Sequence, residues 1–256
     1  MSQVIKGLGI HGGERASVEF HPVEGPVRFR IGKTEILPRA ASVVDTARAT
    51  VLGAGGVRIA TVEHLMAAFA LRGIYQGVLI EVQGQELPGL GGGAKEWYQA
   101  LAEFPAAAPA ACLVKEEVSV SRGQSQASAG PGDEFSFTVS VEFAHPLIGK
   151  QCFASPPRAS LDVLDARTFG FARESAALWE LGLAQGSMPS NTLIFSDSRS
   201  IGPLRGADEP VRHKALDFLG DLYLLGRPAR GDFRVHRGSH QLHLELVRRL
   251  EVLCQS

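Results

Sequence analysis

Residues 210–221 read PVRHKALDFLGD and are expected to form the first turns of a helix. Pro210 suits the first helical position, because an N–H group there would have no partner within the helix. His213, Asp217 and Asp221 recur at intervals of four residues, so they lie along one stripe of the helix. A core helix seldom carries two residues that can ligate a metal, followed one turn later by a second acidic group.

The composition is that of a globular protein with ordinary charge. The chain has 256 residues, of which 45% are hydrophobic and 21% charged, enough for one large domain or two smaller ones. The formal net charge of −1 gives no electrostatic reason to expect nucleic acid or an anionic membrane surface as a partner. No apolar run is long enough to span a bilayer, and the start of the chain has no signal-peptide pattern. The three cysteines are widely spaced, so we expect neither a disulfide framework nor a zinc ribbon. This use of cysteine suits a reducing cytosol, so we expect a cytoplasmic location.

The first half of the chain alternates strand and helix patterns. Apolar and polar residues alternate at 16–20 and 27–31, which predicts half-buried strands. Residues 61–72 predict a helix that Thr61 caps and Gly73 ends. A strand at 78–82 and a second helix from Ala94 to about Glu103 follow.

A linker and a second set of similar elements follow. Residues 105–111 are small and include two prolines, so we expect a boundary between domains at 1–108 and 112–256. Residues 113–121 and 135–142 predict a hairpin, and the later elements are strand ends or strands at 167–171, 192–196 and 232–236 and helices at 173–181, at 210–225 and after Ser239. This repeated order indicates an α+β protein with two similar domains.

The residues that could bind a metal come from both halves. Catalytic zinc sites use three protein ligands and keep one position open. His213 and Asp217 offer two ligands from one helix, and Glu63-His64 offers a third beside a carboxylate. The residues alone leave two interpretations open: a metal site between the halves, or a helix face with a solvated histidine and a capping aspartate.

Six short motifs, in order along the chain, resemble one family. They are GIHGG (9–13), TVEHL (61–65), FAHP (143–146), ARTFGF (166–171), VRHKALDFLGD (211–221) and the late Ser239-His240. Together they are similar to the UDP-3-O-acyl-N-acetylglucosamine deacetylases, the zinc amidases that commit the lipid A pathway.

The resemblance implies a fold, a reaction and a set of residues. The fold is two β-α-α-β sandwich domains that face each other, with Zn²⁺ and a UDP-acyl-aminosugar bound at their interface. The implied metal ligands are His64, His213 and Asp217. The implied catalytic residues are Glu63 as general base, His240 as cationic acid, Asp221 as the residue that holds His240, and Thr168 as an oxyanion donor. Substrate contacts are implied for Lys214, Phe169 and Arg237, and for the acyl-chain region at 182–188.

Two runs depart from the family pattern. Residues 90–94 read LGGGA where an MDGSA-like run is common, and residues 238–243 read GSHQLH where an SGHxLN-like run is common. Neither departure touches an implied ligand. A paralogue that acts on another N-acyl sugar or amide would also keep the metal ligands, and a binding module without catalysis is the third alternative. We expect a monomer.

The other histidines have simpler interpretations. His21, His236 and His243 are expected to be structural or solvated. His145 is expected to end a strand, and the glycine-flanked His11 is either a turn residue or a neighbour of the site.

Overall fold

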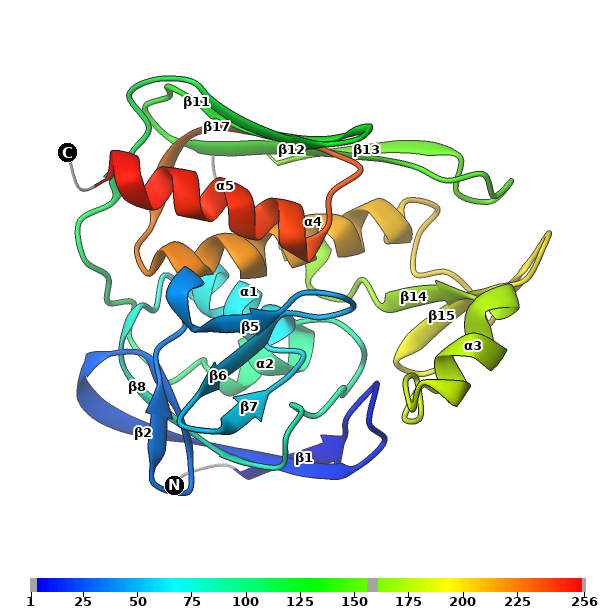
Figure 1. Ribbon diagram of the computed structural model, residues 1–256, viewed down its shortest axis with the longest axis horizontal. Helices are drawn as coiled ribbons and strands as arrows, with labels where there is room; N and C mark the ends of the chain where they lie inside the picture. The colour runs from blue at the N-terminus through cyan, green and yellow to red at the C-terminus, as the bar shows by residue number, and fades with distance from the viewer. Residues whose placement is uncertain (1–3, 156–160, 255–256) are drawn as a thin grey trace.

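The computed structural model describes residues 4–155 and 161–254 and has the α+β class expected from the sequence. Two sheets form the outer layers, and the longer helices lie between them (Figure 1). Each half of the chain supplies one sheet and the helices that cover its inner face. The division at residues 108–112 stays a proposal.

The first half builds a five-stranded sheet in the order β1-β2-β8-β3-β4. Its strands are β1 (Val4–Leu8), β2 (Arg15–Pro26), β3 (Arg28–Ile31), β4 (Thr34–Ile36) and β8 (Gln76–Gln83), and its helices are α1 (Glu63–Arg72) and α2 (Lys95–Ala100). Phe20 on β2 contacts Phe69 of α1 and Trp97 of α2 edge-on, with ring centroids 6.2 and 6.4 Å apart. Both helices are therefore anchored to one face of this sheet by aromatic packing.

The second half builds the other large sheet, in the order β10-β11-β17-β12-β13, with β9 paired to β17. Its elements are β9 (Cys112–Leu113), β10 (Val118–Arg122), β11 (Ser125–Gly130), β12 (Phe135–Glu142), β13 (Lys150–Ser155), β17 (Ala229–His236), α4 (Glu209–Leu222) with the 3₁₀ turn η4 (Tyr223–Leu225), and α5 (His240–Leu253). Phe218 of α4 packs against Phe137 and Phe233 of this sheet, each with its ring centroid 5.9 Å away.

The predicted hairpin of 113–121 with 135–142 is wrong. β10 pairs with β11 instead, and β12 lies between β17 and β13, parallel to the first and antiparallel to the second. Residues 125–130 read SQASAG and contain no large apolar residue, so the sequence pattern did not predict β11. Central strands of a sheet are chosen by packing as much as by local sequence.

Two small sheets complete the fold. One contains β5 (Val43–Asp45), β6 (Val51–Ala54) and β7 (Val57–Ile59), preceded by η1 (Ala40–Ser42). The other contains β14 (Thr168–Phe171), β15 (Thr192–Phe195) and β16 (Ser200–Ile201), with η2 (Leu161–Val163), η3 (Ala172–Glu174) and α3 (Ser175–Glu180) nearby in the chain. β14, β15 and α3 project to one side of the main layers (Figure 1).

Helix ends follow the sequence in most places, with one exception. Gly73 and Gly226 take left-handed conformations with φ of 67° and 73°, which end α1 and η4 as glycine allows. Thr61 does not cap α1. Its φ is 58°, and its hydroxyl donates to Glu86 Oε1 at 2.9 Å, so the helix begins at Glu63 without a side-chain cap.

The widely spaced cysteines, which predicted no disulfide framework, include one bonded pair. Cys112 and Cys254 are bonded, with Cα atoms 5.4 Å apart, and Cys152 is free and exposed. β9 pairs with β17, and the end of α5 returns to it, which brings together two cysteines separated by 142 residues. Sequence spacing alone could not predict this proximity.

The two halves meet where α1 and α4 pack together. A Cβ atom added at Gly220 of α4 would overlap the carbonyl oxygen of Glu63, so glycine permits this close approach. Tyr223 also donates its hydroxyl to the Ile74 carbonyl at 2.8 Å, across the same contact.

Within the described residues, no helix combines the length and apolar content needed to cross a bilayer.

Candidate active site

The predicted stripe of α4 meets the start of α1. The Oδ1 atom of Asp217 lies 3.5 Å from His213 Nε2 and 3.7 Å from His64 Nε2. All three side chains are buried, and the two imidazole rings meet edge-on with centroids 5.2 Å apart. The residues predicted as ligands from both halves are therefore brought together.

This donor set fits a divalent metal ion. Four ligands about 2.0–2.1 Å from a tetrahedral zinc ion would lie about 3.4 Å from one another, close to the observed separations. His213 Nδ1 contacts the Ala166 carbonyl at 3.0 Å and donates to it, which leaves Nε2 free to ligate. Burial lowers the pKa of His213 and, with His213 nearby, that of His64 to about 3, so both rings are in the neutral form that binds metal.

Asp217 is held as a carboxylate. Burial opposes its charge, but His213 and Lys214 outweigh burial and keep its pKa well below the usual range. Lys214 Nζ donates to Asp217 Oδ2 at 3.0 Å, so the second carboxylate oxygen is neutralised outside the ligand cluster. Burial would lower the pKa of Lys214, but Asp217 reverses this and raises it.

Glu63 lies beside the ligand cluster and faces His240. Burial raises the pKa of Glu63 to about 7, against an opposing effect of His240. The carboxylate accepts the backbone N–H of Thr50 at 3.0 Å through Oε2, and its Oε1 lies 4.0 Å from His240 Nε2. A buried carboxyl group with this pKa can take up a proton near neutral pH.

Asp221 holds His240 from behind. His240 Nδ1 donates to Asp221 Oδ2 at 2.8 Å. Burial would lower the pKa of His240, but Asp221 outweighs it and, with Glu63 and Asp217, raises the pKa to about 10. Within this cluster His240 is therefore a cation that presents Nε2 to Glu63.

Thr50 links the carboxylates of Glu63 and Asp221. This residue was not identified from the sequence. Its backbone N–H binds Glu63 while its hydroxyl donates to Asp221 Oδ1. It is 1% exposed, in the loop before β6. No motif marks it, because the sequence signal of a lone threonine in a loop is the same as that of any turn residue.

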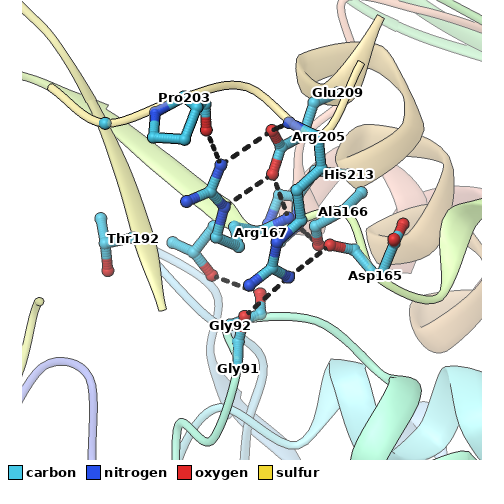
Figure 2. Close-up of polar contacts among 12 residues, drawn as sticks. Gly91, Gly92, Asp165, Ala166, Arg167, Thr192, Pro203, Arg205, Glu209 and His213 are labelled. Carbon is cyan, nitrogen blue, oxygen red and sulfur yellow. Dashed lines mark hydrogen bonds and ion pairs between the residues drawn. The ribbon is translucent and has the colours of Figure 1, made fainter. Parts of the chain in front are cut away.

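Behind His213, a buried ion pair fixes the segment that carries its backbone partner. Arg167 Nε lies 2.8 Å from Glu209 Oε1, and its Nη2 lies 3.0 Å from Oε2 (Figure 2). Glu209 also accepts the backbone N–H groups of Arg167 and Arg205. Since Ala166 precedes Arg167, the pair holds the carbonyl that orients His213.

The predicted oxyanion donor lies next to this segment. Thr168 donates its backbone N–H to the Gly92 carbonyl at 2.8 Å, and its hydroxyl lies 3.2 Å from the same oxygen. The hydroxyl therefore needs to rotate before it can donate to another group. A Cβ atom at Gly93 would overlap the carbonyl oxygens of Leu164 and Ala166, so glycine in the departing LGGGA run permits this close packing.

Of the predicted substrate residues, two lie at the site and one is tied elsewhere. The centroid of the Phe169 ring lies 6.1 Å from that of the His213 ring and 5.6 Å from Lys214 Nζ. Arg237 instead binds Gln124 Oε1 through its guanidinium group.

The predicted acyl-chain region docks on the glycine-rich turn near the start of the chain. Gln185 and Gly186 donate their N–H groups to the carbonyls of His11 and Ile10 at 2.9 and 3.0 Å. His11 is one of the lining residues of an adjoining cleft of 610 Å³, together with Arg48, Glu86 and Leu183. Burial lowers the pKa of His11, with an opposing effect of Glu86. The charge of His240 also lowers the pKa of His11, so His11 lies within electrostatic range of the site.

The remaining histidines divide between structural and site positions. His145 is buried, with Nε2 2.5 Å from the Ser196 carbonyl. His21 pairs with Glu81 at 3.2 Å, and His236 contacts the Ser140 hydroxyl at 3.0 Å. His243, expected to be structural or solvated, is buried and donates to Asp221 Oδ2.

Known proteins resemble this chain along nearly its whole length. The model of the family described as UDP-3-O-acyl N-acetylglycosamine deacetylase matches residues 2–251. A protein named UDP-3-O-acyl-N-acetylglucosamine deacetylase from Thermosynechococcus vestitus is 39% identical, over 94% of this chain and 89% of its own length. Proteins with the same name from Myxococcus xanthus and Brucella melitensis are each 36% identical, over 96% of this chain and 83% and 91% of their own lengths. The chain therefore belongs to the UDP-3-O-acyl N-acetylglycosamine deacetylase family.

Proposed function

We propose that this chain is a zinc-dependent deacetylase that removes the N-acetyl group of UDP-3-O-(3-hydroxyacyl)-N-acetylglucosamine, the committed step of lipid A biosynthesis. The observation that carries the proposal is the pair formed by Glu63 and His240. Their carboxylate and imidazole atoms lie 4.0 Å apart, beside the converging ligand atoms of His64, His213 and Asp217. A proton acceptor and a proton donor thus face one small space.

The metal would be held by His64, His213 and Asp217. A bound zinc ion supplies Lewis-acid polarisation of the acetamide carbonyl and promotes the ionisation of water at neutral pH. The chain's own residues perform the proton transfers.

Glu63 is proposed as the general base. Its pKa of about 7 makes a substantial fraction ionised at neutral pH while leaving it basic enough to accept a proton. It takes one proton as water attacks the carbonyl carbon. The N–H of Thr50 fixes the other carboxylate oxygen and so keeps the carboxyl plane in place.

His240 is proposed as the cationic acid. Its charge stabilises the negative charge that develops on the carbonyl oxygen, together with the hydroxyl of Thr168 once that group has rotated. As the carbon–nitrogen bond breaks, His240 gives its Nε2 proton to the leaving nitrogen. The acyl group leaves as acetate, the second proton of the attacking water passes to the freed glucosamine amine, and the proton held by Glu63 returns to His240 through solvent.

Substrate contacts are proposed for three further side chains. Lys214 presents a cationic Nζ beside Phe169, which suits the charged and planar parts of a nucleotide-linked sugar. Arg237 would have to leave Gln124 to join them. Residues 182–188 would contact the acyl chain. We further propose that the protein acts as a cytoplasmic monomer without nucleic acid.

Acetate release from the UDP-sugar, measured together with metal content, tests the proposal. We expect about one tightly bound zinc per chain. Glu63→Ala should lose activity and keep the zinc. Zinc without activity on the UDP-sugar, but with activity on simpler N-acetyl compounds, would indicate a different amide substrate. Absence of bound zinc would refute the enzyme proposal.

A further inference from the structure

The carboxylate of Asp221 binds two imidazole rings through one oxygen atom. His240 Nδ1 lies 2.8 Å from Oδ2, and His243 Nδ1 lies 2.7 Å from the same atom. The other oxygen, Oδ1, accepts the Thr50 hydroxyl. Asp221 is fully buried and His243 is 1% exposed, so solvent does not compete for these bonds.

The shared oxygen fixes the tautomer of His243. An ionised carboxylate only accepts hydrogen bonds, so each Nδ1 that contacts it must carry a proton. In the part of the chain that the structure describes, His243 Nε2 is buried and has no hydrogen-bond partner. A bare ring nitrogen is less costly to bury unpaired than a charged N–H group. His243 therefore donates to Asp221 through Nδ1, as His240 does.

Packing prevents the His243 ring from turning away. His240 and His243 lie three residues apart on α5 and so share one face of it. The Phe218 ring meets the His243 ring nearly edge-on at 5.4 Å. A Cβ atom at Gly238 would overlap His243 Nε2, so this glycine makes room for the ring. The donor at Nδ1 is aimed at Asp221 by its surroundings on both sides.

We propose that His243 is a positioning residue for His240 that acts through Asp221. By occupying one lone-pair direction of Oδ2, it stops the carboxylate from rotating and leaves the other lone pair aimed at His240 Nδ1. His240 then presents Nε2 to Glu63 in a fixed direction. The inference rests on the proposed catalytic role of His240, because a carboxylate that is well aimed matters only if the ring it holds reacts.

The test compares donors with a non-donor of similar size. His243→Phe removes the N–H group and keeps an aromatic ring, whereas His243→Asn and His243→Gln keep an N–H donor. Zinc content, thermal midpoint, kcat and KM are measured for each purified variant. We expect His243→Phe to lower kcat by about ten- to a hundredfold, as loss of a residue that orients a catalytic group does. KM and zinc content should stay near the original values, and at least one amide variant should recover most of kcat.

Several outcomes would overturn the inference. One is full kcat in His243→Phe while His240→Gln is inactive. Another is an equal loss of kcat in His243→Phe, His243→Asn and His243→Gln at equal folded fraction, which would show that His243 acts only through its packing. A second bound metal ion that is lost in His243→Phe would show that Asp221, His240 and His243 form a metal site. Full activity of His240→Gln would instead refute the proposed role of His240.

A measurement on the unaltered protein keeps the inference testable if His243→Phe does not fold. Imidazole ¹⁵N NMR of the zinc-loaded protein reports which ring nitrogen of each histidine is protonated. We expect the Nδ1 atom of His243 to carry a proton. A proton on Nε2 and none on Nδ1 would refute the hydrogen bond on which the proposal depends.

Discussion

Replacement of Asp221 by asparagine removes the negative charge that holds His240 in its cationic form. Asp221 raises the pKa of His240 against the effect of burial, to about 10. If protonated His240 is the active form, activity falls as pH rises through this pKa. In Asp221→Asn the pKa falls, so the alkaline limb of the pH profile should move to lower pH.

The size of this change follows from the geometry. The contacting atoms are 2.8 Å apart, which places the centres of the two charges about 4 Å apart. At an effective dielectric constant of about 20, their attraction is about 4 kcal/mol. One pKa unit corresponds to about 1.4 kcal/mol, so the limb should move down by about 3 pH units. Glu63 and Asp217 remain in place and continue to favour the cation.

The assay is kcat/KM for acetate release between pH 5 and 11, which reports groups on the free enzyme. Charged and titratable groups near His240 include Asp217 and Asp221 on α4, Glu63 and His64 on α1, His243 on α5, and His11. Asp133→Asn, in an exposed turn before β12, is the matched control and should leave the profile in place. An unchanged alkaline limb in a zinc-loaded, folded Asp221→Asn enzyme would refute the assignment.

Three further substitutions test how the site is supported. Gly220→Ala should destabilise the fold by about 1–3 kcal/mol through overpacking and lower kcat; full stability in urea unfolding would contradict the close approach of α1 and α4. Glu209→Gln leaves the Arg167 guanidinium buried without a countercharge, and we expect a loss of about 3–5 kcal/mol; a thermal midpoint equal to that of the parent would refute this. Cys112→Ser removes the bond to Cys254 and should cost about 2–5 kcal/mol, with kcat per folded molecule preserved. A large loss of kcat at full folding would show that the bond shapes the site.

The sequence predicted those parts of the site that repeat at helical spacing or belong to a recognisable motif. His213 and Asp217 were predictable because residues four apart on a helix share a face. Gly73 was predictable as a helix end because glycine adopts the left-handed conformation without strain. The motif around Glu63 and His64 placed the third proposed ligand, His64, in the other half of the chain.

The remainder depends on contacts between distant segments. Thr50 binds two carboxylates, one of them 171 residues away, and nothing in its neighbours indicates this. β11 was missed because its residues have weak strand preference, and it is held between two other strands. Cys112 and Cys254 come together because α5 packs against its own sheet. Such pairs become visible when the tertiary structure brings the partners together.

Two hydrogen bonds, from Gln185 and Gly186, tie the proposed acyl-chain region to the glycine-rich turn near the start of the chain. One net hydrogen bond contributes about 0.5–1.5 kcal/mol, so opening both costs about 1–3 kcal/mol. At that cost, about 1–15% of molecules are open at any moment. A bulky acyl chain that enters only the open form would bind more weakly by the same fraction. A Cβ atom at Gly13 or Gly186 would overlap the opposite segment, so glycine at both positions lets the two segments approach closely enough to form these hydrogen bonds. If residues 182–188 contact the acyl chain as proposed, the open fraction at this turn sets how readily that chain enters.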